Sequence, residues 1–202
     1  TQKTDLSHIR ELDYYRQGRF MELDLAARRN LELTETLRSK EKKGSLLWVL
    51  DKTKTPMGGR MLRSWLERPL LSVTAIAKRN AAVAALVEST MAREELIAAL
   101  TGLGDMERLI GRIVYGTAGG RDMVSLRAAI EKLPNLKEQL SAFSDRRLTE
   151  LTAELDTLDD IGGDIAAAIC DEPPFSVREG SIIRDGFNEE VDRLRHILKS
   201  GK

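Results

Sequence analysis

A helical repeat of apolar residues is the feature that most constrains the fold of this chain. In "DMERLIGRIVYG" the apolar side chains recur at i, i+3, i+4, i+7 and i+8, namely at Met106, Leu109, Ile110, Ile113 and Val114. This spacing places all of them on one face of an α-helix. Asp105 is a suitable N-cap and Gly116 a suitable C-terminal stop, so the pattern predicts a short amphipathic helix.

The same repeat continues toward the C-terminus. Further stripes fall at Met123, Leu126, Ile130 and Leu133, then at Leu136, Leu140 and Phe143, then at Leu148, Leu151, Leu155, Leu158 and Ile161. Pro134 separates the first two stripes, and we expect the third helix to break or bend at Gly162 and Gly163. A last helix is expected from Asn188 onward. Short connections such as "TAGG" predict antiparallel neighbours in a helical bundle.

Two stretches depart from the helical period. "FMELDL", from Phe20 to Leu25, alternates polar and apolar residues and predicts a short strand. In "PPFSVREGSIIRDGF" two prolines stop the preceding helix, and β-branched runs flank Gly180, which predicts a small hairpin near 175–185. We expect the strand to pair with this hairpin. The predicted fold class is therefore mainly α, a helical bundle core with a small β element.

The composition excludes several kinds of protein. The 32 Lys and Arg residues balance 32 Asp and Glu residues, so overall charge alone would not draw the chain to nucleic acid or to an anionic membrane. No apolar run approaches the roughly 20 residues that span a bilayer. Cys170 is the single cysteine and fits a reducing compartment, so the cytoplasm is expected. Because the sequence opens on Thr1, we expect a piece of a longer protein.

The balanced net charge hides two segments of opposite sign. Residues 38 to 63 contain eight Lys or Arg residues against Glu41 and Asp51, and residues 149 to 172 contain eight acidic residues and no Lys or Arg. Either segment could be a solvated face or a partner site. The basic segment raises the hypothesis of a surface for DNA or for another domain, with Lys52, Lys54 and Arg60 as the candidate contacts.

The stretch "LDKTKTPMGGRMLRSWLERPLL", residues 50 to 71, is open to two interpretations. Its glycines and lysines suggest a phosphate-binding turn, but the Gly-x-x-x-x-Gly-Lys-Ser/Thr pattern of a P-loop is missing from the sequence. The two histidines, the single cysteine and the lack of a GxSxG or HExxH motif leave no familiar set of catalytic residues or metal ligands. We therefore predict no catalytic residues, no cofactor-binding residues and no metal ligands in this chain.

The alternative interpretation is the start of a helix. Thr55 would be the N-cap and Pro56 the first helical residue. The predicted structural core comprises Met61, Leu62, Trp65 and Leu66 from this helix, with Leu109 and Ile113 from the helix described first. If Trp65 is core, Trp65→Ala should destabilise the chain by about 3 to 5 kcal/mol. Gly58 and Gly59 indicate close packing by another helix or strand, or less readily a bound anion.

Four segments carry a resemblance to a known family. They are "ARRNLEL" at 27–33, "GSLLWVLDKTKTPMGGRMLRSWLERPL" at 44–70, "DMERLIGRIVYGTAGGRDMVSLR" at 105–127 and "GFNEEVDRLR" at 186–195. In this order they closely resemble the core, or lever, region of the MutS family of bacterial DNA mismatch-repair proteins. The similarity spans nearly all of the 202 residues.

The resemblance implies that different domains of the parent protein carry out different tasks. In the family a dimer encircles DNA, a Phe-x-Glu motif in another domain reads the mismatch, a clamp grips the DNA backbone, and an ATPase domain uses ATP and Mg²⁺. The strings Phe20 to Glu22 and Phe187 to Glu189 lie inside core segments of the resemblance, so we reject both as mismatch readers. Expected partners are DNA, through the parent protein, and other domains of the same protein; the parent is expected to be a homodimer, with no membrane partner.

The resemblance also implies the role of this chain. Residues 1–187 would form the helical core and residues 188–202 the start of an outgoing lever helix toward a clamp domain. The expected function is structural and allosteric coupling between the ATPase and the clamp, without catalysis by the chain and with no cofactor of its own. The alternative is an autonomous, non-specific DNA-binding module that uses the basic segment 38–63.

Overall fold

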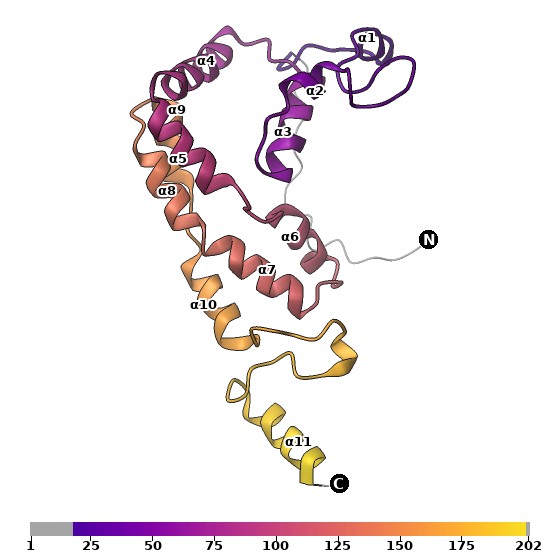
Figure 1. The fold of residues 1–202 in the computed structure, drawn as a ribbon, viewed down its shortest axis with the longest axis vertical. Coiled ribbons are helices and arrows are strands. Elements are labelled where there is room, and N and C mark those ends of the chain that lie inside the picture. Colours follow the sequence, from indigo (N-terminus) through magenta and orange to yellow (C-terminus); the bar gives the residue numbers. More distant parts are fainter. Residues whose placement is uncertain (1–17, 201–202) are drawn as a thin grey trace. The chain divides into compact units, whose positions relative to one another are not determined.

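The structure is a computed structural model that describes residues 18–200, and these residues are mainly helical (Figure 1). The helices are α1 (Leu25–Asn30), α2 (Leu46–Leu50), α3 (Pro56–Glu67), α4 (Val73–Glu88), α5 (Thr90–Leu100), α6 (Met106–Val114), α7 (Gly120–Ile130), α8 (Leu133–Ser141), α9 (Arg146–Glu154), α10 (Asp159–Ala168) and α11 (Glu189–Ser200), with a 3-10 turn at Val177–Glu179. Within the described residues no helix is long and apolar enough to cross a membrane.

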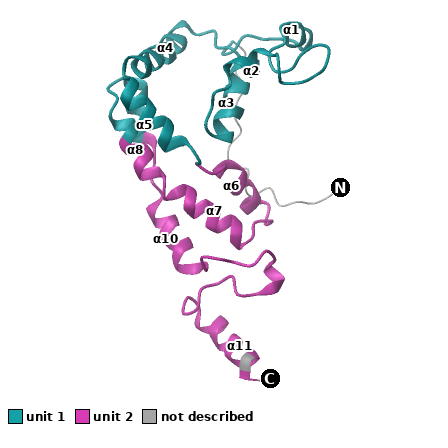
Figure 2. Cartoon of the chain, viewed as in Figure 1, with its two compact units in different colours: residues 1–102, 139–153 teal, residues 103–138, 154–202 magenta. Residues whose placement is uncertain are grey.

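The chain forms two compact units, shown in different colours in Figure 2. Unit 1 consists of residues 1–102 and 139–153, and unit 2 of residues 103–138 and 154–202. The chain therefore passes from one unit to the other three times. The second passage, between Glu138 and Gln139, falls inside α8 and is not a loop.

In unit 1, α2 packs on α3 and α4 packs on α5. Its buried apolar residues are Leu33, Leu47, Ala82, Leu96, Ala99, Phe143 and Leu148. Ser45 is the one polar residue among the buried ones that the structure describes, and it is only 1% exposed. Its hydroxyl accepts a hydrogen bond from Trp48 N at 3.2 Å and donates one to Lys42 O at 2.7 Å, so its burial leaves no unpaired polar atom.

In unit 2, α7 packs against both α6 and α10. The cluster at this contact is Leu126, Ile130 and Ile165, with Met106, Leu109, Met123, Leu158 and Ile169 packed around it. Two glycines outside α7 lie against this helix, and the approach is tight at Gly162. A Cβ at Gly162 would lie 3.1 Å from Ile130 Cγ2, and one at Gly104 would lie 3.5 Å from Ala129 Cβ.

Asp171 joins three parts of unit 2. Its Oδ1 accepts hydrogen bonds from Arg184 at 3.0 Å and from Arg127, which belongs to α7, at 3.1 Å. The hydrogen bonds from Arg184 and then Arg127 lower the pKa of the Asp171 carboxyl below its ordinary value. The segment after α10 is thereby tied both to α7 and to the extended residues 182–184.

The predicted helix ends are confirmed at several positions. Asp105 caps α6 by accepting a hydrogen bond from Arg108 N, and Gly116 follows this helix with φ +68°. Thr55 is the N-cap of α3 and Pro56 its first residue. Asn188 Oδ1 accepts hydrogen bonds from Glu190 N and Val191 N, both at 3.1 Å, where α11 begins. Short polar side chains beside an apolar stripe thus mark where these helices start.

The predicted break at Gly162 and Gly163 is wrong. Both glycines lie inside α10, and the interruption comes earlier, between α9 and α10. There Leu158 has a left-handed backbone (φ 54°), and Asp156 Oδ1 accepts a hydrogen bond from Leu158 N at 3.0 Å. The side chain of Asp156 offers the backbone a turn in place of the helix, whereas Gly162 serves the close approach to Ile130.

The predicted strand at 20–25 is also wrong. Phe20 forms a single antiparallel bridge with Leu70, supported by a hydrogen bond from Met21 N to Pro69 O at 2.8 Å. The expected continuation is replaced by helix α1, because the Asp24 carboxylate accepts a hydrogen bond from Ala27 N at 2.6 Å. The alternating pattern therefore contains an N-cap and does not extend into a strand.

No hairpin forms near 175–185 in the described part of the chain. Ser176 and Glu179 form a capping box around the 3-10 turn, which occupies the position of the expected first strand. The β-branched run that follows pairs instead with the end of α10: Ile183 bridges Ile169, Cys170 N donates to Ile182 O at 2.9 Å, and Arg184 N donates to Ala168 O at 2.8 Å. The small β element is thus reduced to isolated bridges.

The residues expected to form the structural core lie outside the buried set. Leu62, Leu66 and Leu109 are half-buried, and Leu109 packs against the cluster of unit 2. Met61 is 57% exposed, Trp65 43% and Ile113 38%. The helical period predicts these side chains on one face of each helix, and in the described chain they are only partly covered.

Gly120 is the tightest glycine of unit 2. It is buried at the first position of α7, where an added Cβ would lie 2.7 Å from Pro173 Cβ and 2.9 Å from Ile182 Cγ2. Real Cβ atoms do not make contacts this short, so α7 starts where only a glycine fits.

We predict that Gly120→Ala lowers the free energy of unfolding by about 1 to 3 kcal/mol, because the methyl group overpacks the contact with Pro173 and Ile182. Chemical denaturation followed by circular dichroism measures the change. Gly163→Ala is the matched control, since nothing lies within 4 Å of its added Cβ and alanine should stabilise α10 by up to about 1 kcal/mol. Equal effects of the two substitutions would contradict the close approach.

Candidate functional site

The loop between α2 and α3 is organised by the carboxylate of Asp51. Its Oδ1 accepts hydrogen bonds from Thr53 N at 3.2 Å and from Thr53 Oγ1 at 2.6 Å, and its Oδ2 pairs with Lys42 Nζ. The hydrogen bonds from Lys42 and then Thr53 lower the pKa of Asp51 from 3.8 to about 2. Asp51 and Lys42 thereby fix the path of the chain into α3.

This loop packs against the two glycines of α3. A Cβ at Gly58 would lie 3.0 Å from Thr55 Oγ1 and 3.5 Å from Thr53 Cβ, and one at Gly59 would lie 3.4 Å from Thr53 Oγ1. Gly58 N already donates to Thr55 Oγ1 at 3.0 Å, and Gly59 N to Thr55 O at 3.1 Å. The first turn of α3 therefore closes on its own approach loop, where we had expected another helix, a strand or an anion.

The predicted contact residues Lys52, Lys54 and Arg60 are all exposed. Among the described residues no hydrogen bond or ion pair from the side chains of Lys52 and Lys54 is present. Other cations of the basic segment are engaged, since Lys42 pairs with Asp51 and Arg63 Nε lies 3.0 Å from Glu67 Oε1. The structure gathers the predicted residues on one loop and the start of α3.

A second cationic surface of unit 1 is concave. We call it the α4–α9 groove; it has a volume of about 410 Å³ and is lined by Arg19, Leu70, Ser72, Ala75, Lys78, Arg79, Arg147 and Glu150. Among these described residues four are cations and one is a carboxylate. The groove thus carries a net positive charge. Its cations come from three segments that lie far apart in the sequence.

Local structure explains how one wall of the groove forms. Ser72 caps α4 by accepting a hydrogen bond from Ala75 N at 3.3 Å, which fixes where the helix begins. Ala75, Lys78 and Arg79 then follow at i, i+3 and i+4 and share one face of α4. Arg19 is held beside this wall because its carbonyl accepts a hydrogen bond from Leu71 N at 3.4 Å.

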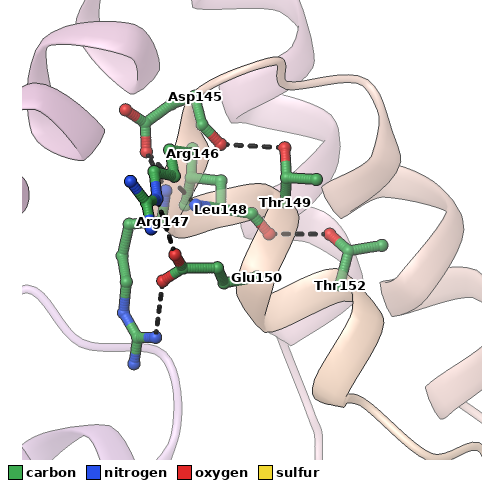
Figure 3. Close-up of polar contacts among 7 residues, drawn as sticks. All are labelled: Asp145, Arg146, Arg147, Leu148, Thr149, Glu150 and Thr152. Atoms are coloured by element: carbon green, nitrogen blue, oxygen red, sulfur yellow. Dashed lines mark hydrogen bonds and ion pairs between the residues drawn. The ribbon is translucent and has the colours of Figure 1, made fainter.

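The opposite wall is the first half of α9, shown in Figure 3. Asp145 Oδ1 accepts hydrogen bonds from Arg147 N at 2.8 Å and Leu148 N at 3.2 Å, as an N-cap does. One oxygen of Glu150 accepts from Arg146 Nε at 2.9 Å and the other from Arg147 Nη1 at 3.5 Å. The hydrogen bond from Arg146 is the main reason why the pKa of Glu150 lies below its ordinary value.

Arg79 is the central cation of the groove. Its guanidinium carbon lies 3.6 Å from the centroid of the Trp65 ring, which is a stacked cation–π contact between α4 and α3. Burial, and then repulsion from the positive charge of Arg147, lower the pKa of Arg79 below its ordinary value. No carboxylate among the described residues is hydrogen-bonded to it. An anion in the groove would relieve this repulsion.

The chemistry available to the groove is electrostatic binding. The described residues contain no group of three or more His, Cys, Asp or Glu side chains that could hold a metal ion. Arginine and lysine side chains suit anionic groups such as phosphates and carboxylates. Sequence reasoning missed Arg19, Lys78, Arg79 and Arg147, because no local pattern shows that residues so distant in the chain line one groove.

The pairing of Lys42 with Asp51 generates a prediction about pH. Because folding lowers the pKa of Asp51, its carboxylate stabilises the fold above about pH 4, and this contribution is lost as the pH falls toward 2. The free energy of unfolding of the wild type should exceed that of Asp51→Asn at pH 6, and the difference should shrink by pH 3. Glu95→Gln, at an exposed residue, is the control. A difference for Asp51→Asn that is independent of pH would argue against the pairing.

The stack of Trp65 on Arg79 generates a second prediction. Since Trp65 is 43% exposed, Trp65→Ala should cost roughly 2 kcal/mol of stability, less than the earlier expectation for a fully buried ring. A double-mutant cycle with Arg79→Gln should give a coupling of about 0.5 to 1 kcal/mol. The same cycle with Trp48→Ala, a comparably exposed tryptophan, should be additive. Additivity for Trp65 as well would show that the stack contributes nothing.

Comparison with known proteins gives one consistent result. The family model of MutS domain III matches residues 26–200 of the chain. The DNA mismatch repair protein MutS of Desulforamulus reducens is 48% identical over 202 residues, which are 100% of this chain and 23% of that protein. The MutS proteins of Acetivibrio thermocellus (48%, with 23% of that protein covered) and Lachnoclostridium phytofermentans (46%, with 22% covered) also match over 100% of this chain.

The chain thus spans less than a quarter of the length of these relatives. The family match extends over both compact units and includes α3, the α4–α9 groove from Leu70 to Glu150, and α11. The chain belongs to the MutS domain III family, a part of DNA mismatch repair proteins.

Proposed function

We propose that this chain is the coupling module of a DNA mismatch-repair protein, connecting the part that binds nucleotide with the part that grips DNA. The observation that carries the proposal is α8. Its residues 133–138 belong to unit 2 and its residues 139–141 to unit 1, and a single helix runs through both. A continuous helix passes on a displacement or rotation that a flexible loop would absorb.

The C-terminal helix supports the same role. Arg195 Nη1 pairs with Asp185 Oδ1 at 2.7 Å, and Arg195 Nη2 donates to Ile183 O at 2.8 Å. These bonds fix the base of α11 within unit 2. On both sides of Arg195 in this helix, Leu194, Ile197 and Leu198 are 51%, 56% and 74% exposed, so its apolar stripe is still uncovered. A fixed base and an uncovered stripe suit the start of an outgoing lever.

The remaining parts of the mechanism belong to the parent protein. We propose that DNA and the other domains of the same polypeptide are its partners, that the parent is a homodimer in the cytoplasm, and that ATP and Mg²⁺ bind outside this chain. Nucleotide and DNA would each favour one of two arrangements of the helices, and such coupling is reciprocal between the two sites. The chain itself would carry out no catalysis.

The competing function is autonomous DNA binding by the basic segment 38–63. Two of its eight cations, Lys42 and Arg63, form ion pairs with Asp51 and Glu67. These pairs reduce the charge that the segment offers to DNA, and Lys52 and Lys54 lie on the exposed loop between α2 and α3. We therefore favour coupling over autonomous binding by this segment.

The test is a pair of glycines at the passage through α8, in a full-length protein that carries this chain. Glu138→Gly with Gln139→Gly should reduce several-fold the factor by which mismatched DNA changes the rate of ATP hydrolysis, because the helix becomes flexible at the boundary. The rate without DNA should stay close to that of the wild type. The purified chain alone should hydrolyse no ATP above a protein-free control.

The matched control is Glu94→Gly with Glu95→Gly, a pair of exposed positions inside α5 of unit 1. It carries a similar propensity cost of about 2 kcal/mol for two glycines but lies away from the passage. The coupling factor should then be preserved. If both glycine pairs reduce it equally, or neither does, α8 is not the coupling element.

A further inference from the structure

We propose that the α4–α9 groove binds the phosphate backbone of duplex DNA. The inference rests on the proposed function only in taking DNA as a partner of the parent protein. It assigns the contact to Arg19, Lys78, Arg79 and Arg147, none of which belongs to the basic segment 38–63.

The charges of the groove are only partly neutralised from within, since Arg147 pairs with Glu150 and three further cations remain. Among its described lining residues Glu150 is the one carboxylate, and both of its oxygens already accept hydrogen bonds from Arg146 and Arg147. Lys78 and Arg79 form no ion pair with a described residue. Positive side chains gathered in a concave surface raise the local concentration of anions, so the groove favours a polyanion over solvent.

The placement of the Arg79 guanidinium suits a phosphate ligand. Its guanidinium plane is stacked on Trp65, which leaves the N–H edge as the part able to donate hydrogen bonds. A guanidinium held in one plane loses less rotamer freedom when it forms two parallel hydrogen bonds with a phosphate. The neighbouring positive charge of Arg147 is unfavourable without an anion and favourable with one.

The spread of the cations favours a row of phosphates over a single carboxylate. They come from three elements: the segment before α1, the first half of α4 and the start of α9. Duplex DNA carries one negative charge per roughly 1.7 Å of its axis, so several cations can each meet a phosphate without converging. Because these contacts are to the backbone, binding should be independent of base sequence.

The test uses the full chain and a fluorescein-labelled 20-base-pair duplex, with fluorescence anisotropy at about 50 mM salt. Lys78→Gln with Arg147→Gln should weaken binding about tenfold and reduce the salt dependence by about two units of slope, since two phosphate contacts are lost. Lys52→Gln with Lys54→Gln removes the same charge from the competing surface and should weaken binding less than twofold.

A variant that should bind DNA more tightly separates an effect on the groove from an effect of misfolding. Glu150→Gln removes the one described carboxylate of the groove and should tighten DNA binding about two- to fivefold, a change that loss of structure cannot produce. Circular dichroism and thermal unfolding of each variant verify the fold. Should the double variant unfold, Lys78→Gln alone, at an exposed residue, should still weaken binding about threefold.

Three results would overturn the proposal. One is a dissociation constant of the wild type weaker than about 100 μM at low salt, the weak end of non-specific binding. Another is a loss of affinity in the Lys52 and Lys54 variant as large as in the groove variant. The third is competition by poly-glutamate as effective, per charge, as competition by unlabelled duplex, which would identify an acidic protein segment as the ligand. None of these three results would contradict the proposed role of α8 in coupling.

Discussion

Close approach of the backbone to α7 is the constraint on which unit 2 depends. Gly104 lies against Ala129, Gly162 against Ile130, and Gly120 itself against Pro173 and Ile182. The contacts at Gly162 and Gly120 are ones that a side chain would widen, and with the contact at Gly104 they let α6, α10 and the segment after α10 meet one helix of 11 residues. Burial of Leu126, Ile130 and Ile165 follows from this approach, because apolar side chains pack densely only when the backbones are near.

Much of the helical architecture could be predicted from local sequence. The 3.6-residue period and a polar residue before it are local signals, and they correctly marked the starts of α3, α6 and α11 at Thr55, Asp105 and Asn188. The errors came where a local signal was ambiguous. Asp24 caps a helix inside an alternating pattern, and Gly162 fits a close helix contact as well as a helix break.

The candidate site was less predictable, for a physical reason. Lys52, Lys54 and Arg60 lie near one another in the sequence and were predicted as contacts, yet the groove is built from Arg19, Lys78, Arg79 and Arg147. Only tertiary packing brings α4 beside α9 and places two guanidiniums together. Composition also misled, since Glu150 belongs to the acidic segment 149–172 but lies among cations in the fold. Charge counted along a chain is a poor measure of charge on a surface.

The double pairing of Asp171 has a consequence for the order in which unit 2 folds. The hydrogen bond between Arg127 and Asp171 joins residues 44 positions apart, whereas the contact of α6 with α7 closes only a short connection. Closing the longer loop costs more chain entropy, so the pair α6 and α7 is expected to form first and to provide the surface on which α10 and Asp171 dock. The base of α11 is then expected to become ordered last. The contacts that anchor α11 would therefore open with the least loss of buried structure, and α11 is the helix proposed to carry motion outward.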